Sequence, residues 1–250
     1  MGRRELLRVP AALAGGLALT ACGPTTLRLV ETHDAPPDPA PSGSAKPPAS
    51  EAQVPVTPPE DLMREHGVLK RILLVYREGI RRIDRGEPVP ARELNAGARI
   101  IRTFIEQYHE ELEEKYVFPA LTRAGKLTDT VSVLDLQHKR GRVLTARILK
   151  ATGGSPAAAS PGTRGRRDLV ADMSAFIRMY EPHEAREDTV VFPAFRDVVP
   201  PARFTELGEI FEDEEHRRFG ARGFEGVVDQ VADIEKALGI YDLSQFTPRV

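Results

Sequence analysis

The chain has 250 residues, 41% of them hydrophobic, and is therefore long enough to bury a substantial core. Its 35 Lys and Arg residues nearly balance 37 Asp and Glu residues, with both signs interspersed, which argues against nucleic acid as a partner. Because Cys22 is the only cysteine, the sequence excludes an internal disulfide framework and a thiolate metal cluster, so any metal must be bound by His and carboxylate side chains.

The first 21 residues are typical of a signal peptide. A basic start containing Arg3-Arg4 precedes an uncharged, mostly apolar stretch over residues 9–21, which is too short to span hydrocarbon ~30 Å thick. This stretch ends in LTAC at 19–22, which resembles the lipobox of bacterial lipoproteins, where the Cys is lipidated and the chain is cut before it. The arginine pair resembles a twin-arginine export signal. We therefore expect an extracytoplasmic protein of the bacterial cell envelope, held on a membrane by a lipid anchor at Cys22.

Residues 22–59 predict a Pro-rich tether. Ten of the 21 prolines lie in this segment among Ala, Ser and scattered charges, without apolar periodicity. Such a composition cannot bury enough surface to offset the entropy lost on ordering. His33 lies here and is not expected to bind a metal, because a disordered segment cannot hold a fixed coordination geometry.

Four long amphipathic helices are predicted between residues 60 and 199, which favours an antiparallel four-helix bundle. A capping box at 57–60 marks the start of the first helix, and Gly125 marks the end of the second. The second helix is expected at about 90–123 and the third at about 128–150, and a loop rich in Gly, Ser, Pro and Ala at 152–163 precedes the fourth. Pro119 and Pro193 are expected to bend or end the second and fourth helices.

Apolar residues recur at steps of three and four along each helix, and these steps define one inward face that also carries His and Glu. The expected inward positions are Leu62, His66, Leu69, Leu73, Tyr76, Ile80 and Ile83 in the first helix; Ala98, Ile101, Ile105, His109, Leu112 and Tyr116 in the second; Val131, Leu134, His138, Thr145 and Ile148 in the third; and Leu169, Met173, Phe176, Tyr180, His183, Glu187, Val190 and Ala194 in the fourth.

Residues 200–250 predict a C-terminal helical extension. Two shorter amphipathic stretches, about Ala202–Arg218 and Phe224–Leu238, are expected either to cover the bundle or to contact a partner. No stretch of the sequence shows convincing alternation with period two. The predicted fold class is therefore all-α, a four-helix bundle with extra C-terminal helices.

An internal repeat carries the candidate site. HEELEEKYVFPAL at 109–121 and HEAREDTVVFPAF at 183–195 agree at seven of thirteen positions. The other two inward histidines, His66 and His138, are separated along the chain by nearly the same interval as the two copies of this motif. Two helical hairpins packed face to face would therefore bring four His and two Glu to one level of the core. These six residues are the predicted metal ligands: His66, His109, Glu113, His138, His183 and Glu187.

The donor set indicates which metals would fit. Burying two carboxylates and four imidazoles without compensation would be costly, and cations are the natural compensation. Four imidazole nitrogens and two bridging carboxylates offer enough donors for two metals with open positions. Mixed nitrogen and oxygen donors without thiolate suit iron best, followed by manganese and zinc. An open dinuclear site of this kind can bind O2, peroxide or NO.

Residues 60–195 resemble a hemerythrin-like (HHE cation-binding) domain, with the order H, HxxxE, H, HxxxE. The resemblance implies a non-haem di-iron centre with an oxo or hydroxo bridge, in which the four histidines are terminal ligands and Glu113 and Glu187 are bridges. This set of four His and two Glu is similar to that of family members that repair iron-sulfur centres or respond to NO or peroxide.

The sequence departs from the oxygen carriers of this family. These carriers have a second His on the third helix, whereas here Arg142 lies four residues after His138. They also have an Asp five residues after the His of the fourth helix. Asp188 occupies that position and competes with Glu187 for the bridging role, but the internal symmetry of the repeat favours Glu187.

Several functions are compatible with these residues. The leading expectation is a di-iron protein that handles O2, NO or peroxide. The sequence contains no flavin, nucleotide or haem-attachment motif, so turnover would need either an external electron donor or a disproportionation such as that of H2O2 to water and O2. The alternative is a non-enzymatic oxygen or iron carrier, store or sensor, and a bundle whose His–Glu pairs only hydrogen-bond is a third interpretation. Tyr108 and Tyr180 either contact ligands or only pack, and His216 either binds a peripheral metal or lies on an exposed acidic face.

Overall fold

The computed structural model describes residues 56–153 and 162–250, and every regular element in these two ranges is helical. The predicted signal peptide, Cys22, His33 and nearly all of the Pro-rich tether lie outside the described residues. None of the helices in the described part of the chain is long and apolar enough to cross a membrane.

The first helix, α1 (Pro58–Asp84), begins at the expected capping box. The Glu60 carboxylate accepts hydrogen bonds from the Thr57 backbone N–H at 3.0 Å and from the Thr57 hydroxyl at 2.7 Å. These bonds satisfy polar groups that the first turn of a helix otherwise leaves without partners.

The second helix is continuous but contains two π-helical segments. Its parts are α2 (Ala91–Ile100), η1 (Ile101–His109), α3 (Glu110–Leu112), η2 (Glu113–Val117) and α4 (Phe118–Arg123). The helix ends where the sequence indicated, because Gly125 has φ +65° and the Lys126 N–H donates to the Leu121 carbonyl at 2.9 Å.

The third and fourth helices complete the bundle. They are α5 (Thr128–Thr152), then α6 (Thr163–Arg186), η3 (Glu187–Val191) and α7 (Phe192–Val198). Of the two alternatives expected for Pro119 and Pro193, bending or ending their helices, the second is wrong, because both helices continue beyond them. Each proline lies in the first turn after a π segment, where a missing backbone N–H costs least.

The π segments also correct three predicted inward positions. Tyr116, Val190 and Ala194 are only half-buried, whereas Val117 and Val191, one residue further, are buried. A π turn inserts one residue relative to an α-helix, and one residue corresponds to a rotation of about 100°. The residues from the later part of η2 and η3 onward therefore present a different face to the core than a regular helix would.

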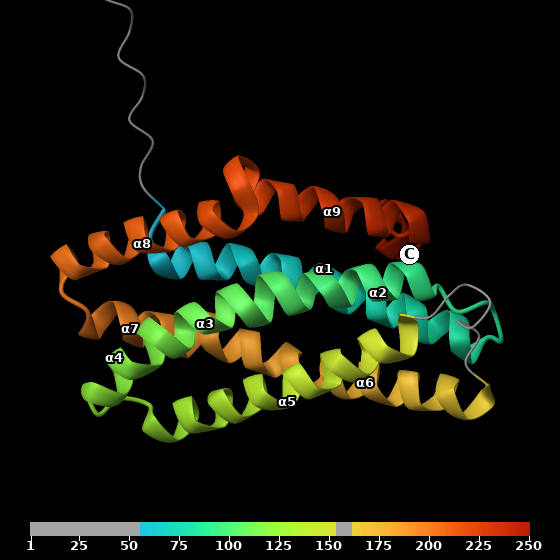
Figure 1. Ribbon diagram of the computed structural model, residues 1–250, viewed down its shortest axis with the longest axis horizontal. Coiled ribbons are helices and arrows are strands. Elements are labelled where there is room, and N and C mark those ends of the chain that lie inside the picture. The colour runs from blue at the N-terminus through green and yellow to red at the C-terminus, as the bar shows by residue number, and fades with distance from the viewer. Residues whose placement is uncertain (1–55, 154–161) are drawn as a thin grey trace, which may run out of the picture. The chain divides into compact units, whose positions relative to one another are not determined.

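The four long helices form a closed bundle in which α1 and α5 each pack against α2 and α6 (Figure 1). The C-terminal helices α8 (Pro201–Phe219) and α9 (Gly223–Leu238) lie against α1, and α9 also packs against α2, with short 3-10 turns at Gly220–Arg222 and Leu243–Phe246. The extension thus covers the bundle, which is one of the two alternatives that the sequence left open.

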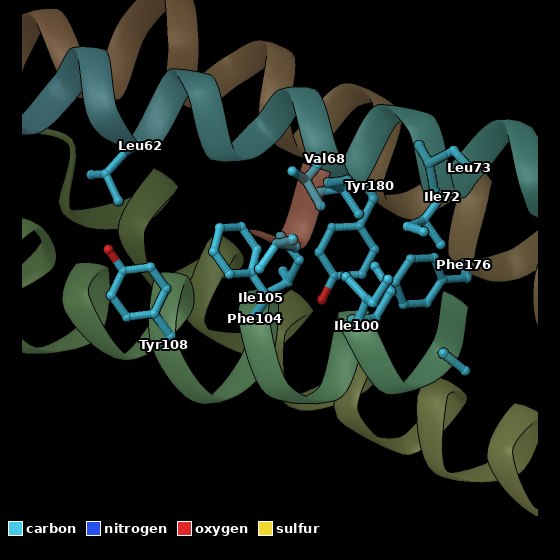
Figure 2. Packing of buried hydrophobic residues seen from close by; sticks show 14 of the residues in the cluster. Leu62, Val68, Ile72, Leu73, Ile100, Phe104, Ile105, Tyr108, Phe176 and Tyr180 are labelled. Atoms are coloured by element: carbon cyan, nitrogen blue, oxygen red, sulfur yellow. The ribbon is translucent and has the colours of Figure 1, made fainter. Parts of the chain in front are cut away.

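The bundle core is aromatic on one side of its centre. Figure 2 shows Phe104, Phe176 and Tyr180 packed beneath α1 with Ile72 and Leu73. Phe176 stacks on Tyr180 with ring centroids 4.3 Å apart, and Tyr180 meets His183 edge-on at 5.2 Å. The apolar core therefore directly adjoins the candidate ligands and shields them from water on that side.

Candidate metal centre

All six predicted ligands meet at one level of the bundle. Each of the four long helices supplies one histidine: His66 from α1, His109 from η1, His138 from α5 and His183 from α6. Glu113 and Glu187 are the first residues of η2 and η3. All six side chains are buried, with exposures of at most 3%.

The six side chains form two groups of three. One group is His66, His109 and Glu113, and the other is His138, His183 and Glu187; within each group the candidate ligand atoms lie within 4.8 Å of one another. The Nε2 atoms of the two histidines are 3.1 Å apart in the first group and 3.3 Å apart in the second. Each group therefore presents two imidazole nitrogens and one carboxylate to a common point.

Each carboxylate also lies between the two groups. Glu113 Oε2 is 3.6 Å from Nε2 of His109 and 3.5 Å from Nε2 of His138. Glu187 Oε2 is 3.4 Å from Nε2 of His66 and 3.0 Å from Nε2 of His183. Both glutamates thus contact one histidine of each group, which is the arrangement that a bridging carboxylate requires.

The outer ring nitrogens are all hydrogen-bonded to side-chain oxygens. The four Nδ1 partners are Asp188 Oδ1 for His66 (2.7 Å), Glu65 Oε2 for His109 (2.6 Å), Glu114 Oε1 for His138 (3.0 Å) and Gln137 Oε1 for His183 (2.9 Å). Such partners fix the tautomer and orientation of a ligating imidazole and leave Nε2 free for a metal.

Three of these outer partners were missed by the sequence reasoning. Glu65, Glu114 and Gln137 each adjoin a predicted ligand in the sequence, and Asp188 was considered only as a bridge. The signal that could have found them is the repeat itself. Glu65 and Gln137 stand directly before the first histidine of each hairpin, and Glu114 and Asp188 stand directly after the glutamate of each HxxxE motif.

The buried oxygens of the two glutamates fit a bound cation. Among the described residues, neither carboxylate oxygen of Glu113 has a hydrogen-bond partner, and Glu187 meets only the Nε2 atoms of His66 and His183, through Oε2. Burial and the charge of Glu187 raise the pKa of Glu113 well above its usual value, and burial lowers the pKa of His109. A positive ion between them would supply the missing partners and offset both effects. The residues present therefore fit a metal held by nitrogen and oxygen donors.

The two groups differ in the charge behind their histidines. In the first group, the Nδ1 atom of each histidine is hydrogen-bonded to a carboxylate, whereas Nδ1 of His183 is hydrogen-bonded to the neutral side chain of Gln137. Glu114, behind His138, is also bound by Arg142 at 2.6 Å. The first group therefore carries more negative charge in its outer shell than the second.

The remaining candidates lie around the centre or away from it. Tyr180 donates a hydrogen bond to Glu110 Oε1 at 2.6 Å, so it touches His183 through its ring and not through its hydroxyl. Tyr108 is fully buried beside His109. His216 is exposed on α8 and belongs to none of the metal-compatible groups found in the described ranges.

A cavity of about 340 Å³ between α5 and α6 reaches the second group. It is lined by His183 and Gln137 together with Val133, Leu134, Pro182 and Arg186. Of the six predicted ligands, His183 lines this cavity, so the cavity offers a small molecule an approach to the second group.

Comparison with known proteins agrees with this geometry. The family described as the hemerythrin HHE cation binding domain matches residues 57–195. The chain is 59% identical over 249 residues to uncharacterized proteins of Mycobacterium bovis and of two Mycobacterium tuberculosis strains, and the aligned region covers 99% of this chain and 91% of each relative. No solved structure matches the chain significantly.

Proposed function

The chain belongs to the hemerythrin HHE cation-binding family, and on this basis we propose that its buried centre binds two iron ions and handles O2, NO or peroxide outside the cytoplasm. One observation carries the proposal. Four imidazole Nε2 atoms and the carboxylates of Glu113 and Glu187 converge at one buried level, and each carboxylate lies near one histidine of each group.

In this proposal each group would hold one ion, and Glu113 and Glu187 would be the carboxylates shared between the two ions. Glu187 takes the bridging role because its Oε2 approaches His66 and His183, one histidine from each group. Asp188 is instead hydrogen-bonded to the outer nitrogen of His66, on the far side of the ring. In this proposal Asp188 would therefore orient His66 and would not bridge.

Bound iron would supply the ability to exchange electrons with a small oxygen or nitrogen species. The chain's own residues orient the ligands and exclude water. Phe192 stacks on His66 at 5.6 Å and Phe118 stacks on His138 at 5.4 Å, so each group has an aromatic cover at equivalent positions of the repeat. The cavity beside His183 gives a small molecule its approach.

The metal assignment is tested by metal content. Full-length protein produced with iron should contain about two irons per chain and show ferric charge-transfer absorption in the near ultraviolet. Glu113→Ala and His109→Ala should each reduce the iron content, whereas His216→Ala, which alters an exposed histidine, should retain it. Protein that contains zinc and no iron after this preparation would contradict the di-iron proposal.

Turnover and reversible binding are separated by the response to peroxide. If the centre is catalytic, excess H2O2 should be consumed over many turnovers, for example by disproportionation of 2 H2O2 to 2 H2O and O2 or with an added electron donor. If the protein is a carrier or sensor, a stoichiometric amount of peroxide, O2 or NO should change the absorption spectrum completely. Excess peroxide should then not be consumed.

We also place the protein in the bacterial cell envelope, because the sequence around Cys22 resembles a lipobox and a Pro-rich segment follows it. Lipid at Cys22 would anchor the bundle to the membrane through that segment. Wild-type protein should then enter the detergent phase, and Cys22→Ser should remain unprocessed or become soluble. Wild-type protein that stays aqueous with residues 1–21 attached would refute the anchor.

A further inference from the structure

A second cluster of carboxylates lies beside the proposed centre, between α1 and α8. It consists of Asp61, Glu65 and Glu215 and is called the acidic cluster below; one oxygen of each residue lies within 4.8 Å of the others. Glu65 is fully buried, and the Asp61 side chain is only 15% exposed. Three carboxylates this close repel one another unless protons or a cation neutralise them.

Independent contacts hold the acidic cluster in place. Glu65 Oε2 is hydrogen-bonded to Nδ1 of His109 at 2.6 Å. Glu215 Oε1 accepts a hydrogen bond of 3.0 Å from the Phe224 backbone N–H at the start of α9. Gly223 has φ +40°, and a Cβ there would lie 2.0 Å from Glu215 Oε1. These contacts hold the carboxylates of Glu65 and Glu215 in place beside Asp61.

A buried hydroxyl lies against the inner end of the acidic cluster. Tyr108 is 0% exposed, and its hydroxyl lies next to the Glu65 carboxylate. Within the described part of the chain, neither the Tyr108 Oη nor Glu65 Oε1 makes a hydrogen bond of regular geometry. Figure 2 shows the Tyr108 hydroxyl turned toward α1, the helix that carries Asp61 and Glu65. The buried end of the cluster thus offers further oxygen atoms to a cation.

The positive charge near the acidic cluster offsets only part of its negative charge. Arg64 lies 3.6 Å from Asp61, but it also pairs with Glu225 at 3.5 Å and covers the Phe224 ring at 4.5 Å. The carboxylates on the other side of the centre differ, because Arg142 binds Glu110 at 3.0 Å and Glu114 at 2.6 Å.

We propose that the acidic cluster, together with the Tyr108 hydroxyl, binds a hard divalent cation of the Mn²⁺ or Mg²⁺ class at a site separate from the dinuclear centre. Carboxylate and hydroxyl oxygens without nitrogen donors suit such ions. Glu65 connects the two sites, since its other oxygen binds His109. A cation in the acidic cluster draws charge from Glu65 and so changes the environment of a ligand of the centre.

The test uses full-length protein already loaded with iron, titrated with Mn²⁺ while free Mn²⁺ is measured by electron paramagnetic resonance. We expect about one Mn²⁺ per chain beyond the iron. Glu215→Gln should weaken this binding at least about tenfold, since Gln retains the acceptor for the Phe224 N–H but removes a charge. Glu209→Gln, which makes the same change at an exposed position of α8, should leave binding unchanged.

Iron content measured in the same samples separates the two sites. If the centre takes up no iron and binds Mn²⁺ instead, wild type and Glu215→Gln should still differ by one Mn²⁺ per chain. Wild-type protein that binds no Mn²⁺ beyond the centre would overturn the proposal, because the acidic cluster would then be neutralised by protons. Equal binding by wild type and a folded Glu215→Gln would overturn it as well.

Discussion

Gln137 distinguishes the two halves of the proposed centre through a single side chain. Its side-chain oxygen is hydrogen-bonded to the outer nitrogen, Nδ1, of His183. The equivalent histidine of the first group, His109, has the carboxylate of Glu65 in this place. A carboxylate partner makes a ligating imidazole more basic and strengthens its bond to a metal. The second group, which also lines the cavity, should therefore hold its metal less tightly than the first.

Replacing Gln137 with Glu should reduce this difference. During removal of metal by a chelator, the wild type should lose one of its two metals faster, and Gln137→Glu should slow that phase by about tenfold. Gln230→Glu makes the same change at an exposed position of α9 and should not affect either phase. Identical kinetics in wild type and Gln137→Glu would show that the outer partner does not control metal affinity.

Asp61 should make the stability of the protein depend on pH. Burial and the charge of Glu215 raise the pKa of Asp61 from 3.8 to about 6. Between these pH values the folded protein keeps a proton that the unfolded chain has lost, so this residue's contribution to stability falls as the pH rises and remains lower above about pH 6.

Asp61→Asn removes this pH dependence. Without added divalent cations, the variant should be more stable than wild type at pH 7, by up to about 3 kcal/mol, and the difference should disappear below about pH 4. Urea unfolding at both pH values measures this, with Asp233→Asn at an exposed site of α9 as the control. A variant less stable than wild type at pH 7 under these conditions would contradict the raised pKa.

The helices and their inward faces could largely be predicted, because the three-and-four spacing is a local property of the sequence. Leu62 and Leu69, for example, are fully or almost fully buried as expected. The positions after Glu113 and Glu187 could not be predicted, since a π turn changes the hydrogen bonding of the backbone and no residue type marks it reliably. Both η2 and η3 end at the valine of the repeated VFPA, Val117 and Val191, so the repeat places the two π turns at equivalent positions.

The six predicted ligands converge in the structure because each lies on an inward face and recurs in the repeat. The outer partners could not be predicted in this way, because each binds a histidine other than its neighbour in the sequence. Glu65 precedes His66 but is hydrogen-bonded to His109, and Gln137 precedes His138 but is hydrogen-bonded to His183. These pairs depend on how two helices are rotated against each other, which the spacing along one helix does not determine.

Gly141 allows α5 and α6 to approach closely beside the centre. A Cβ at this position would lie 2.0 Å from Tyr180 Oη, which donates its hydrogen bond to Glu110. Gly141→Ala should therefore displace the hydroxyl and destabilise the protein by roughly 1–3 kcal/mol, although Ala is the better helix former.

Gly67→Ala on α1 is the matched control for this change. Within the described ranges, a Cβ at Gly67 meets no atom within 4 Å, so this variant should be more stable by roughly 0.5–1 kcal/mol. Chemical unfolding of both variants gives the comparison. If Gly141→Ala raised the free energy of unfolding as Gly67→Ala is expected to, the inference that Tyr180 lies too close to α5 for a Cβ at position 141 would be contradicted.

The C-terminal helices are joined to the bundle along its length. Arg71 on α1 forms a two-pronged ion pair with Glu235 on α9, at 3.0 and 2.6 Å. The Phe219 ring lies 5.2 Å from Phe104 and 5.3 Å from Tyr108, the aromatic residues of η1. Because these contacts reach the helix that carries His109, the extension and the bundle should unfold as one cooperative unit.

Phe211→Ala tests this cooperativity from the outermost layer. Phe211 on α8 is fully buried and packs against Tyr116 at 5.7 Å, so its removal should cost about 3–5 kcal/mol and lower the melting temperature by about 10 °C.

In iron-loaded protein, the helical circular dichroism and the ferric absorption should be lost at the same temperature, since the centre depends on helices that the extension covers. Phe246→Ala, at a 53% exposed residue, should change neither signal. An early loss of part of the helical signal with the ferric absorption intact would mean that the extension unfolds independently of the bundle.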